Sequence, residues 1–245
     1  MPKLELRQVF FRYDEKPLLD NISLRVEAGE FVSLLGASGS GKSTILNLLA
    51  GFVRPDAGEM TVDGQAISGM TGHFAYMPQN DLLLKWRTIL DNVCLYADIH
   101  GEKEAAKKVA LQNLPAFGLS GYQDAYPDEL SGGMRQRAAF LRTALCAADI
   151  MLLDEPFGAL DVISRGDMQD WLNDMRAALK RTTLLVTHDI DEAIYLSDRI
   201  YVLGGTPSRI VREVCIDEKA RTRDWLYEQG ALRKLLHGLI RGERS

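Results

Sequence analysis

The chain has 245 residues, of which 46% are hydrophobic and 26% are charged, and its formal net charge is −5. This length is sufficient for one domain with a well-buried core, and the negative charge argues against general electrostatic binding to DNA or RNA. No apolar run reaches the roughly 18 to 20 residues that span a bilayer, and the first residues do not resemble a secretory signal, so we expect a cytosolic protein.

The amino-terminal region has the pattern of half-buried strands. Apolar and polar residues alternate at positions 4–9 and 22–26, and a short strand pattern at 59–64 runs into an Asp63-Gly64 turn. Strands with one apolar face are typical of antiparallel sheets. We therefore expect an antiparallel sheet in this part of the chain.

A glycine-rich loop follows the short apolar run at residues 31–35. Its glycines let consecutive backbone N–H groups turn inward, and the helix that begins near Lys42 directs its positive dipole end to the same point. In this GxxxxGK[ST] pattern Lys42 is expected to bridge the β- and γ-phosphates of a nucleotide, and Ser43 to coordinate Mg²⁺. The alternative is a plain glycine-rich linker. The predicted nucleotide-binding residues here are Gly36, Ala37, Ser38, Gly39, Ser40, Gly41, Lys42, Ser43 and Thr44.

Two helix-forming periodic patterns, at residues 88–117 and 131–147, indicate a helical lobe inserted into the core at about residues 86–148. Within this lobe, Ser131, Gly132 and Gly133 stand at the start of a helix. They would form a second anion-binding helix terminus in the same chain. An ordinary helix start capped by Ser131 is the alternative.

Apolar runs at residues 150–153 and 184–187 are each followed by polar residues. This is expected of buried parallel strands whose carboxyl ends carry a site, so the core is predicted to be an α/β sheet. Asp154 is expected to hold the Mg²⁺ shell, while Glu155 polarises an attacking water. A solvated acidic turn before Pro156 is the alternative.

Residues 206–245 are predicted to form a C-terminal strand and an amphipathic helical tail. We expect the tail to pack on the rest of its own chain, with pairing to a partner or contact with an anionic membrane surface as alternatives. Its apolar positions at helical spacing and the basic residues around them are Leu232, Leu235, Leu236, Leu239, Arg233, Lys234, Arg241 and Arg244. The three cysteines, Cys94, Cys146 and Cys215, are widely scattered, which is typical of reduced thiols.

The order of these motifs, with Gln79 and His188 between and after them, resembles the nucleotide-binding subunit of ATP-binding-cassette (ABC) transporters. The resemblance runs from about residue 4 to about residue 203. It implies a P-loop NTPase with a RecA-like α/β core, an antiparallel β subdomain and an inserted ABC-type helical subdomain, together forming a nucleotide-binding domain over residues 1–205. It also implies ATP and Mg²⁺ as cofactors.

The resemblance assigns roles to further residues. His188 would contact the γ-phosphate and orient the general base Glu155, and Gln79 would couple Mg²⁺ and water to the helical lobe. Tyr13 would stack on adenine, with a place in the core of an edge strand as the alternative. Two copies would pack head to tail, so that Ser131, Gly132 and Gly133 of one close on the nucleotide of the other. Asp161 would link the two sites along that interface.

The resemblance also implies membrane partners. The segment at residues 81–88 would receive a short helix of an integral membrane permease subunit, on an apolar cluster formed by Leu82, Leu83, Leu84 and Trp86; internal packing of this cluster is the alternative. The sequence looks like the nitrate, sulfonate and taurine importer branch, and thiamine-precursor importers are similar, although Lys85 and Ala148 stand where that branch commonly has proline.

These implications predict an ATPase coupled to transport, bound at the cytoplasmic face of the cell inner membrane and served indirectly by a solute-binding protein. An exporter ATPase, a lipoprotein-extraction ATPase and a soluble ABC ATPase are the alternatives. A soluble ABC ATPase usually has tandem cassettes or a long heptad-rich insertion, and the sequence has neither.

Overall fold

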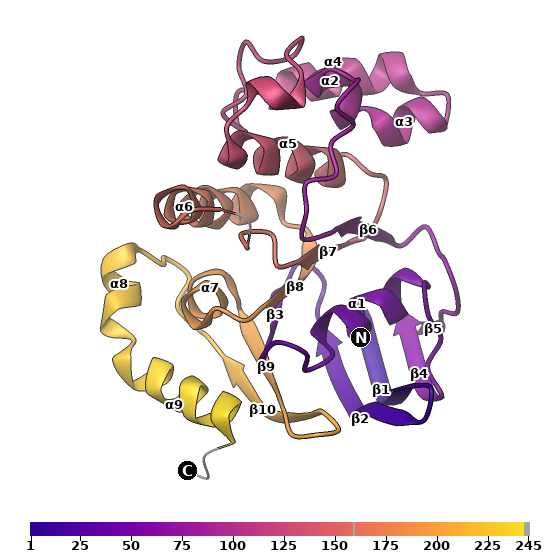
Figure 1. Cartoon of the computed structure of the whole chain (residues 1–245), viewed down its shortest axis with the longest axis vertical. Coiled ribbons are helices and arrows are strands. Elements are labelled where there is room, and N and C mark those ends of the chain that lie inside the picture. Colours follow the sequence, from indigo (N-terminus) through magenta and orange to yellow (C-terminus); the bar gives the residue numbers. More distant parts are fainter. Residues whose placement is uncertain (159, 243–245) are drawn as a thin grey trace.

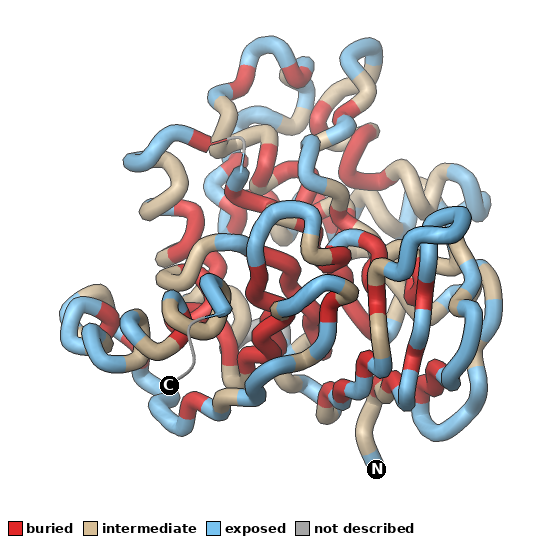
Figure 2. The backbone as a smooth tube through the Cα atoms, turned by 60° about the horizontal axis from the view of Figure 1, so that its bottom comes forward, coloured by how far each residue is buried: buried red, intermediate tan, exposed pale blue. Residues whose placement is uncertain are grey.

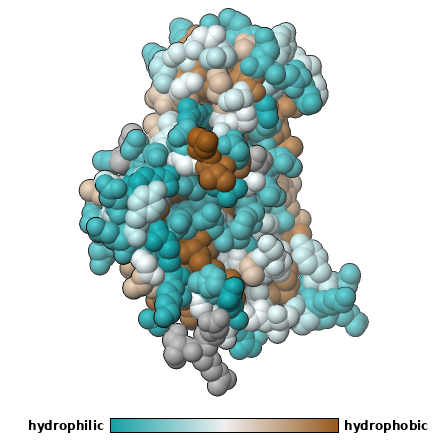
Figure 3. Space-filling model, turned by 60° about the vertical axis from the view of Figure 1, so that its left-hand side comes forward, coloured by the Kyte–Doolittle hydropathy of each residue, from teal (hydrophilic) through white to brown (hydrophobic). Residues whose placement is uncertain are grey.

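The computed structural model describes residues 1–158 and 160–242, except for the side chains of residues 177–179. Figure 1 shows a helical lobe above a sheet-based core, with an antiparallel sheet on one side of the core and the C-terminal helices on the other. The face in Figure 3 is mainly hydrophilic, with compact apolar patches. Among the described helices, none is both long and apolar enough to span a bilayer.

The larger sheet has the strand order β10-β9-β3-β8-β7-β6. Its bounds are β3 (Phe31–Leu35), β6 (Phe74–Met77), β7 (Ile150–Asp154), β8 (Thr182–Thr187), β9 (Arg199–Gly204) and β10 (Arg209–Cys215). All neighbouring strands are parallel except β10, which pairs antiparallel with β9. The predicted parallel core is confirmed, and the carboxyl ends of β3, β8 and β7 lie side by side.

Both faces of this sheet are buried, which Figure 2 shows as a red centre. Side chains of successive strand residues point to opposite faces. In β7, Met151 and Leu153 join the core beneath the helical lobe, whereas Ile150 and Leu152 join the core shared with the antiparallel sheet. The strand can therefore be apolar throughout.

The smaller sheet is antiparallel, as predicted, with the order β2-β1-β4-β5. It consists of β1 (Leu4–Tyr13), β2 (Lys16–Val26), β4 (Ala57–Val62) and β5 (Gln65–Ala66). The alternating residues Leu4, Leu6 and Val9 are buried in the core that this sheet shares with α1 (Lys42–Ala50).

The helical lobe lies between β6 and β7. It contains α2 (Ile89–Val93), α3 (Leu95–Ile99), α4 (Lys103–Asn113), a short 3₁₀ turn at Pro127–Glu129, and α5 (Gly132–Ala144). The helix-forming pattern at residues 88–117 is divided into short helices. Cys94 ends α2 and begins α3, and Gly101, with φ +79°, turns the chain before α4.

The remaining helices are α6 (Val162–Leu179), α7 (Ile190–Leu196), α8 (Arg223–Glu228) and α9 (Gly230–Arg241). Leu226 of α8 and Leu236 of α9 are buried in the core beneath the helical lobe, so the tail packs on its own chain, as expected. Arg244 lies outside the described residues. Strand β10 extends the core sheet, and the domain boundary at residue 205 stays a prediction.

Candidate active site

The glycine-rich loop connects β3 to α1 at the carboxyl edge of the core sheet. Gly41 has φ +85° and caps α1, and a Cβ atom at this position would lie 2.6 Å from Cδ2 of Leu19. A larger residue would therefore be both strained and crowded. Ser40 Oγ in the same loop is buried and has no hydrogen-bond partner among the described residues.

The Lys42 side chain folds back over this loop and is 4% exposed. Its Nζ donates to the carbonyl oxygens of Gly36, at 3.0 Å, and Ala37, at 2.9 Å. Nζ also lies 3.9 Å from Oε1 of Glu155. Burial lowers the pKa of Lys42, while the charges of Glu155 and Asp154 oppose that shift.

Ser43 and Asp154 form an oxygen-rich pair. Ser43 Oγ donates to Asp154 Oδ1 at 2.9 Å, and the Tyr76 hydroxyl donates to Asp154 Oδ2 at 3.0 Å. Burial raises the pKa of Asp154, although these two hydrogen bonds oppose the shift. Among the described residues, no cluster of three or more His, Cys, Asp or Glu could hold a metal by itself. A hydroxyl and one carboxylate fit Mg²⁺, which shares its coordination with phosphates and water.

Glu155 and His188 form a hydrogen-bonded pair at the ends of β7 and β8. His188 Nδ1 lies 3.0 Å from Glu155 Oε2. Glu155 has φ +43°, a left-handed conformation that is uncommon for a non-glycine residue. Its N–H donates to the Val186 carbonyl at 2.9 Å, and its carbonyl accepts from the Gly158 N–H at 3.0 Å. The flanking backbone therefore holds a strained conformation at the candidate base.

Lys42, Ser43 and Glu155 border one cavity of about 300 Å³. Its lining residues are Leu18, Ser38, Gly39, Gly41, Lys42, Ser43, Thr44 and Glu155. A smaller cavity of about 160 Å³ borders the other side of the loop, where Ala37 and Ser40 face Pro17 and residues 205–208. Leu18 and the 205–208 turn were missed from the sequence. They carry no motif, and the fold alone brings them to the loop.

Other predicted residues lie outside this cluster. Tyr13 is 49% exposed at the end of β1 and contacts Phe11 edge to face, with ring centroids 4.8 Å apart. Among the described residues, Tyr13 and Gln79 do not line either cavity at the loop. Gln79 instead lies beside Gly158, where a Cβ atom would be 3.3 Å from Gln79 Nε2.

Helix α5 holds the segment that begins at Gln79. Gln136 Nε2 donates to the Gln79 carbonyl at 3.4 Å, and the Arg135 Nε donates to Asp81 Oδ2 at 3.2 Å. Arg142 donates to the carbonyls of Asp81, at 2.6 Å, and Leu82, at 2.8 Å. Several directional bonds therefore fasten this segment to α5.

The predicted apolar cluster after Gln79 is divided between core and surface. Leu83 is 7% exposed, whereas Leu82 and Trp86 are 60% and 75% exposed. Leu83 therefore packs internally, whereas Leu82 and Trp86 lie on the surface. Contact of these two side chains with a permease subunit stays a prediction.

The cap of α5, Ser131, is also exposed, while Gly132 and Gly133 are half-buried, and this helix start lies next to the start of α6. Ser131 caps α5 by accepting the Met134 N–H at 3.3 Å, and a Cβ atom on Gly132 would lie 3.6 Å from Leu160. Asp161 caps α6 by accepting the N–H groups of Ile163 and Ser164. After this cap, Val162 and Ile163 are 85% and 78% exposed.

Comparison with known proteins adds independent findings. The family described as ABC transporter matches residues 19–158. The formylaminopyrimidine import ATP-binding protein of Halalkalibacterium halodurans is 41% identical over 244 residues, which cover 97% of this chain and 96% of that protein. The aliphatic sulfonates import ATP-binding protein 1 of Rhodococcus jostii is 43% identical, with coverage of 99% and 95%. The dimeric, post-hydrolysis structure of the ATP-binding cassette MJ0796 bound to ADP and Pi has a TM-score of 0.72 and 28% identity, with coverage of 88% and 99%.

Proposed function

The chain belongs to the ABC transporter family of ATP-binding subunits, which hydrolyse ATP to power transport, and on this premise we propose that it energises the import of a small solute. The main support for ATP hydrolysis is the pair of Glu155 and His188, whose Oε2 and Nδ1 atoms lie 3.0 Å apart. This pair is next to the loop cavity that Lys42 and Ser43 line. A base oriented by a second group beside a phosphate-binding loop fits attack of water on a terminal phosphate.

In this proposal the loop backbone and Lys42 bind the phosphates of ATP. The Lys42 ammonium leaves the carbonyls of Gly36 and Ala37 for phosphate oxygens, which are stronger acceptors. Glu155 accepts a proton from the attacking water, and His188 holds the Glu155 carboxylate through its ring nitrogen. Ser43 and Asp154 would hold Mg²⁺, which neutralises phosphate charge. Gln79 would extend this shell, and Tyr13 would stack on adenine.

The active unit in this proposal is a homodimer with two composite sites. Support comes from the dimeric cassette to which the chain is similar, and from the exposed Ser131 cap of α5 near the exposed apolar pair Val162 and Ile163. An apolar pair at such a place is typical of a surface that a partner covers. Ser131, Gly132 and Gly133 of one copy would then face the nucleotide of the other, with Asp161 at the interface.

The partner in the membrane would be a permease subunit, which we place against Leu82 and Trp86 at the cytoplasmic face. Relatives named for the import of formylaminopyrimidine and sulfonates, and others named for nitrate and taurine import, support a solute of the nitrate, sulfonate, taurine or thiamine-precursor kind. We propose that a solute-binding protein delivers it. Affinity purification from native membranes in mild detergent, followed by mass spectrometry, tests this. We expect a permease and a solute-binding protein; recovery of ribosomal or DNA-maintenance proteins instead would contradict the importer assignment.

A further inference from the structure

A series of hydrogen bonds, buried except at Arg223, connects the first residue of α8 to the strand end before His188. Arg223 Nη1 donates to Gln169 Oε1 at 3.1 Å, and Gln169 Nε2 donates to Glu192 Oε1 at 3.1 Å. Thr187 Oγ1 donates to the other oxygen, Glu192 Oε2, at 2.5 Å. Gln169, Glu192 and Thr187 are at most 5% exposed. This series of hydrogen bonds therefore runs from α8 across α6 and α7 to β8.

The Thr187 hydroxyl controls the turn that carries His188. A hydroxyl has a single hydrogen, and Thr187 uses it on Glu192, which leaves its oxygen to accept the Asp189 N–H at 3.0 Å. This bond closes a local turn across His188. The His188 ring in turn meets Glu155 at 3.0 Å. Loss of the acceptor on Glu192 would free the hydroxyl to rotate and would loosen the turn.

Arg223 sets the orientation of the Gln169 amide at the other end. A guanidinium only donates, so the amide oxygen faces Arg223 and the amide NH₂ faces Glu192. Arg223 is itself fixed by Nε to Asp170 Oδ1 and by Nη2 to the Gly166 carbonyl, both at 2.7 Å. The three bonds use the planar fork of arginine, which a lysine does not reproduce.

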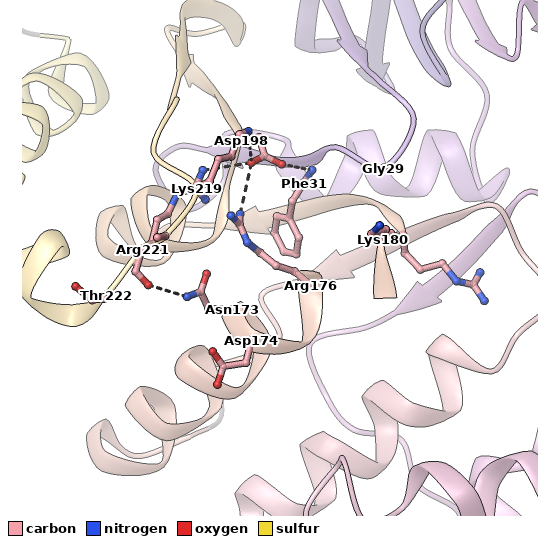
Figure 4. Close-up of a pocket in the computed structure, with 12 residues that line it drawn as sticks. Gly29, Phe31, Asn173, Asp174, Arg176, Lys180, Asp198, Lys219, Arg221 and Thr222 are labelled. Carbon is pink, nitrogen blue, oxygen red and sulfur yellow. Dashed lines mark hydrogen bonds and ion pairs between the residues drawn. The ribbon is translucent and has the colours of Figure 1, made fainter. Parts of the chain in front are cut away.

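The tail is anchored immediately before Arg223, as Figure 4 shows. The Arg221 side chain is fully buried and donates to Asp198 Oδ1 at 3.3 Å, and its carbonyl accepts from Asn173 Nδ2 at 3.0 Å. These groups border a cavity of about 600 Å³ between the tail and α6. The second tail helix is also close to the turn, because Lys234 and His237 of α9 line a cavity of about 420 Å³ with His188.

Among the residues of this hydrogen-bond series, Glu192 has a buried carboxyl group with a raised pKa. Burial raises the pKa of Glu192 to about 7, and the charge of Asp189 adds to the shift, while hydrogen bonds from Thr187 and Gln169 and the charge of Arg165 oppose it. Other charged groups near this side chain are Arg223, beyond Gln169, with its partner Asp170, and Asp191 of the same helix with its partner Arg233. The carboxylate accepts both bonds when it is ionised; once protonated, it must donate with one oxygen.

We propose that Glu192, oriented by Gln169 and Arg223, positions His188 through the Thr187 hydroxyl, and that the C-terminal tail thereby sets the rate of ATP turnover. This inference rests on the proposed ATPase function. Glu192 is a positioning residue, since its carboxylate contacts Thr187 and not His188 itself. A partner that displaces the tail would slow hydrolysis without touching the nucleotide.

Steady-state ATP hydrolysis by the full chain tests the proposal with three variants, each matched to a control. Thr187→Val is paired with Thr187→Ser, Arg223→Lys with the exposed Arg212→Lys, and Glu192→Gln with the exposed Glu228→Gln. We expect kcat to fall roughly three- to thirty-fold in the first member of each pair, the range of couplings through packed networks. The KM for ATP and the kcat of the controls should stay at the parent values.

The pH profile supplies a readout that a purely structural role would not change. The parent and Glu228→Gln should lose turnover as the pH falls through about 7, where Glu192 becomes protonated, whereas Glu192→Gln should lack this limb. A kcat and a pH profile like those of the parent in Thr187→Val and Arg223→Lys would overturn the proposal. A rise in KM together with the fall in kcat would also overturn it, because it would indicate general disruption of the site. Failure of the ATPase function itself would appear separately, as absence of ATP turnover in the parent, and failure of the assigned base as full turnover in Glu155→Gln.

Discussion

At the scale of single residues, Lys42 has the most direct link to nucleotide binding. Its buried ammonium is satisfied by two loop carbonyls, and it stands 3.9 Å from Glu155. Hydrogen bonds that involve a charged group contribute about 1.5 to 3 kcal/mol. We therefore expect Lys42→Ala to weaken ATP binding roughly 10- to 100-fold. Calorimetric titration with ATP measures this affinity, and the variant of an exposed lysine, Lys108→Ala, serves as control. An affinity like that of the parent in Lys42→Ala would contradict the phosphate-loop assignment.

Glu192 should make folding stability depend on pH. Its pKa rises from an ordinary value of 4.5 to about 7 in the folded protein, so between these values the folded state binds the proton more tightly than the unfolded state. Stability from this group is therefore highest at low pH and falls as the pH rises from about 4.5 to about 7, by a total on the order of 3 kcal/mol. Urea unfolding should show this extra slope in the parent and in Glu228→Gln, but not in Glu192→Gln. Identical slopes in all three would show that Glu192 ionises normally.

The sequence predicts the residues that meet at the loop because their motifs end neighbouring parallel strands. Asp154 ends β7, while Lys42 and Ser43 follow β3, Glu155 follows β7 and His188 follows β8; the sheet order brings these ends together. Tyr76 and Glu192 could not be found in this way. Their roles depend on burial and on hydrogen-bond partners from distant segments, which short-range patterns do not encode.

At the scale of elements, Asn92 organises the loop that presents Leu82 and Trp86. The Asn92 side chain is fully buried, and its Nδ2 donates to the carbonyls of Leu84, Arg87 and Thr88 while its Oδ1 accepts the Leu84 N–H at 2.6 Å. The sequence assigns residues 88–117 to helices, but it does not reveal that one asparagine of α2 shapes the preceding loop.

Asn92→Ala should therefore destabilise the protein and weaken permease binding. The change leaves buried backbone groups without partners, each of which costs about 1 to 3 kcal/mol, so we expect a loss of about 2 to 4 kcal/mol in chemical unfolding. Asn113→Ala, at the end of α4, removes a single bond to the Val109 carbonyl and serves as control. Equal stability of the two variants would show that Asn92 does not organise the loop.

At the scale of the whole molecule, one copy has the glycine-rich loop and, apart from it, an exposed helix cap at Ser131, which we propose as a second phosphate contact. We expect Ser131→Arg to leave ATP affinity unchanged, because Ser131 does not line the loop cavity among the described residues. Turnover should fall by roughly 100-fold or more, since a donor to the developing phosphate charge is lost and closure is blocked. Ser120→Arg, an exposed change elsewhere in the lobe, should keep full turnover. Full turnover in Ser131→Arg would contradict a phosphate role for this helix start.

The central claim, a dimer that closes on two ATP molecules and opens after hydrolysis, is tested most directly with Glu155→Gln. Gln keeps the shape of the side chain but does not accept a proton, so ATP should be retained and turnover should fall by roughly 100-fold or more. Sizing chromatography with light scattering in Mg·ATP should show a dimer that contains two ATP, and the parent should return to monomers as it hydrolyses ATP. A Glu155→Gln protein that stays monomeric at high concentration with Mg·ATP would contradict the account.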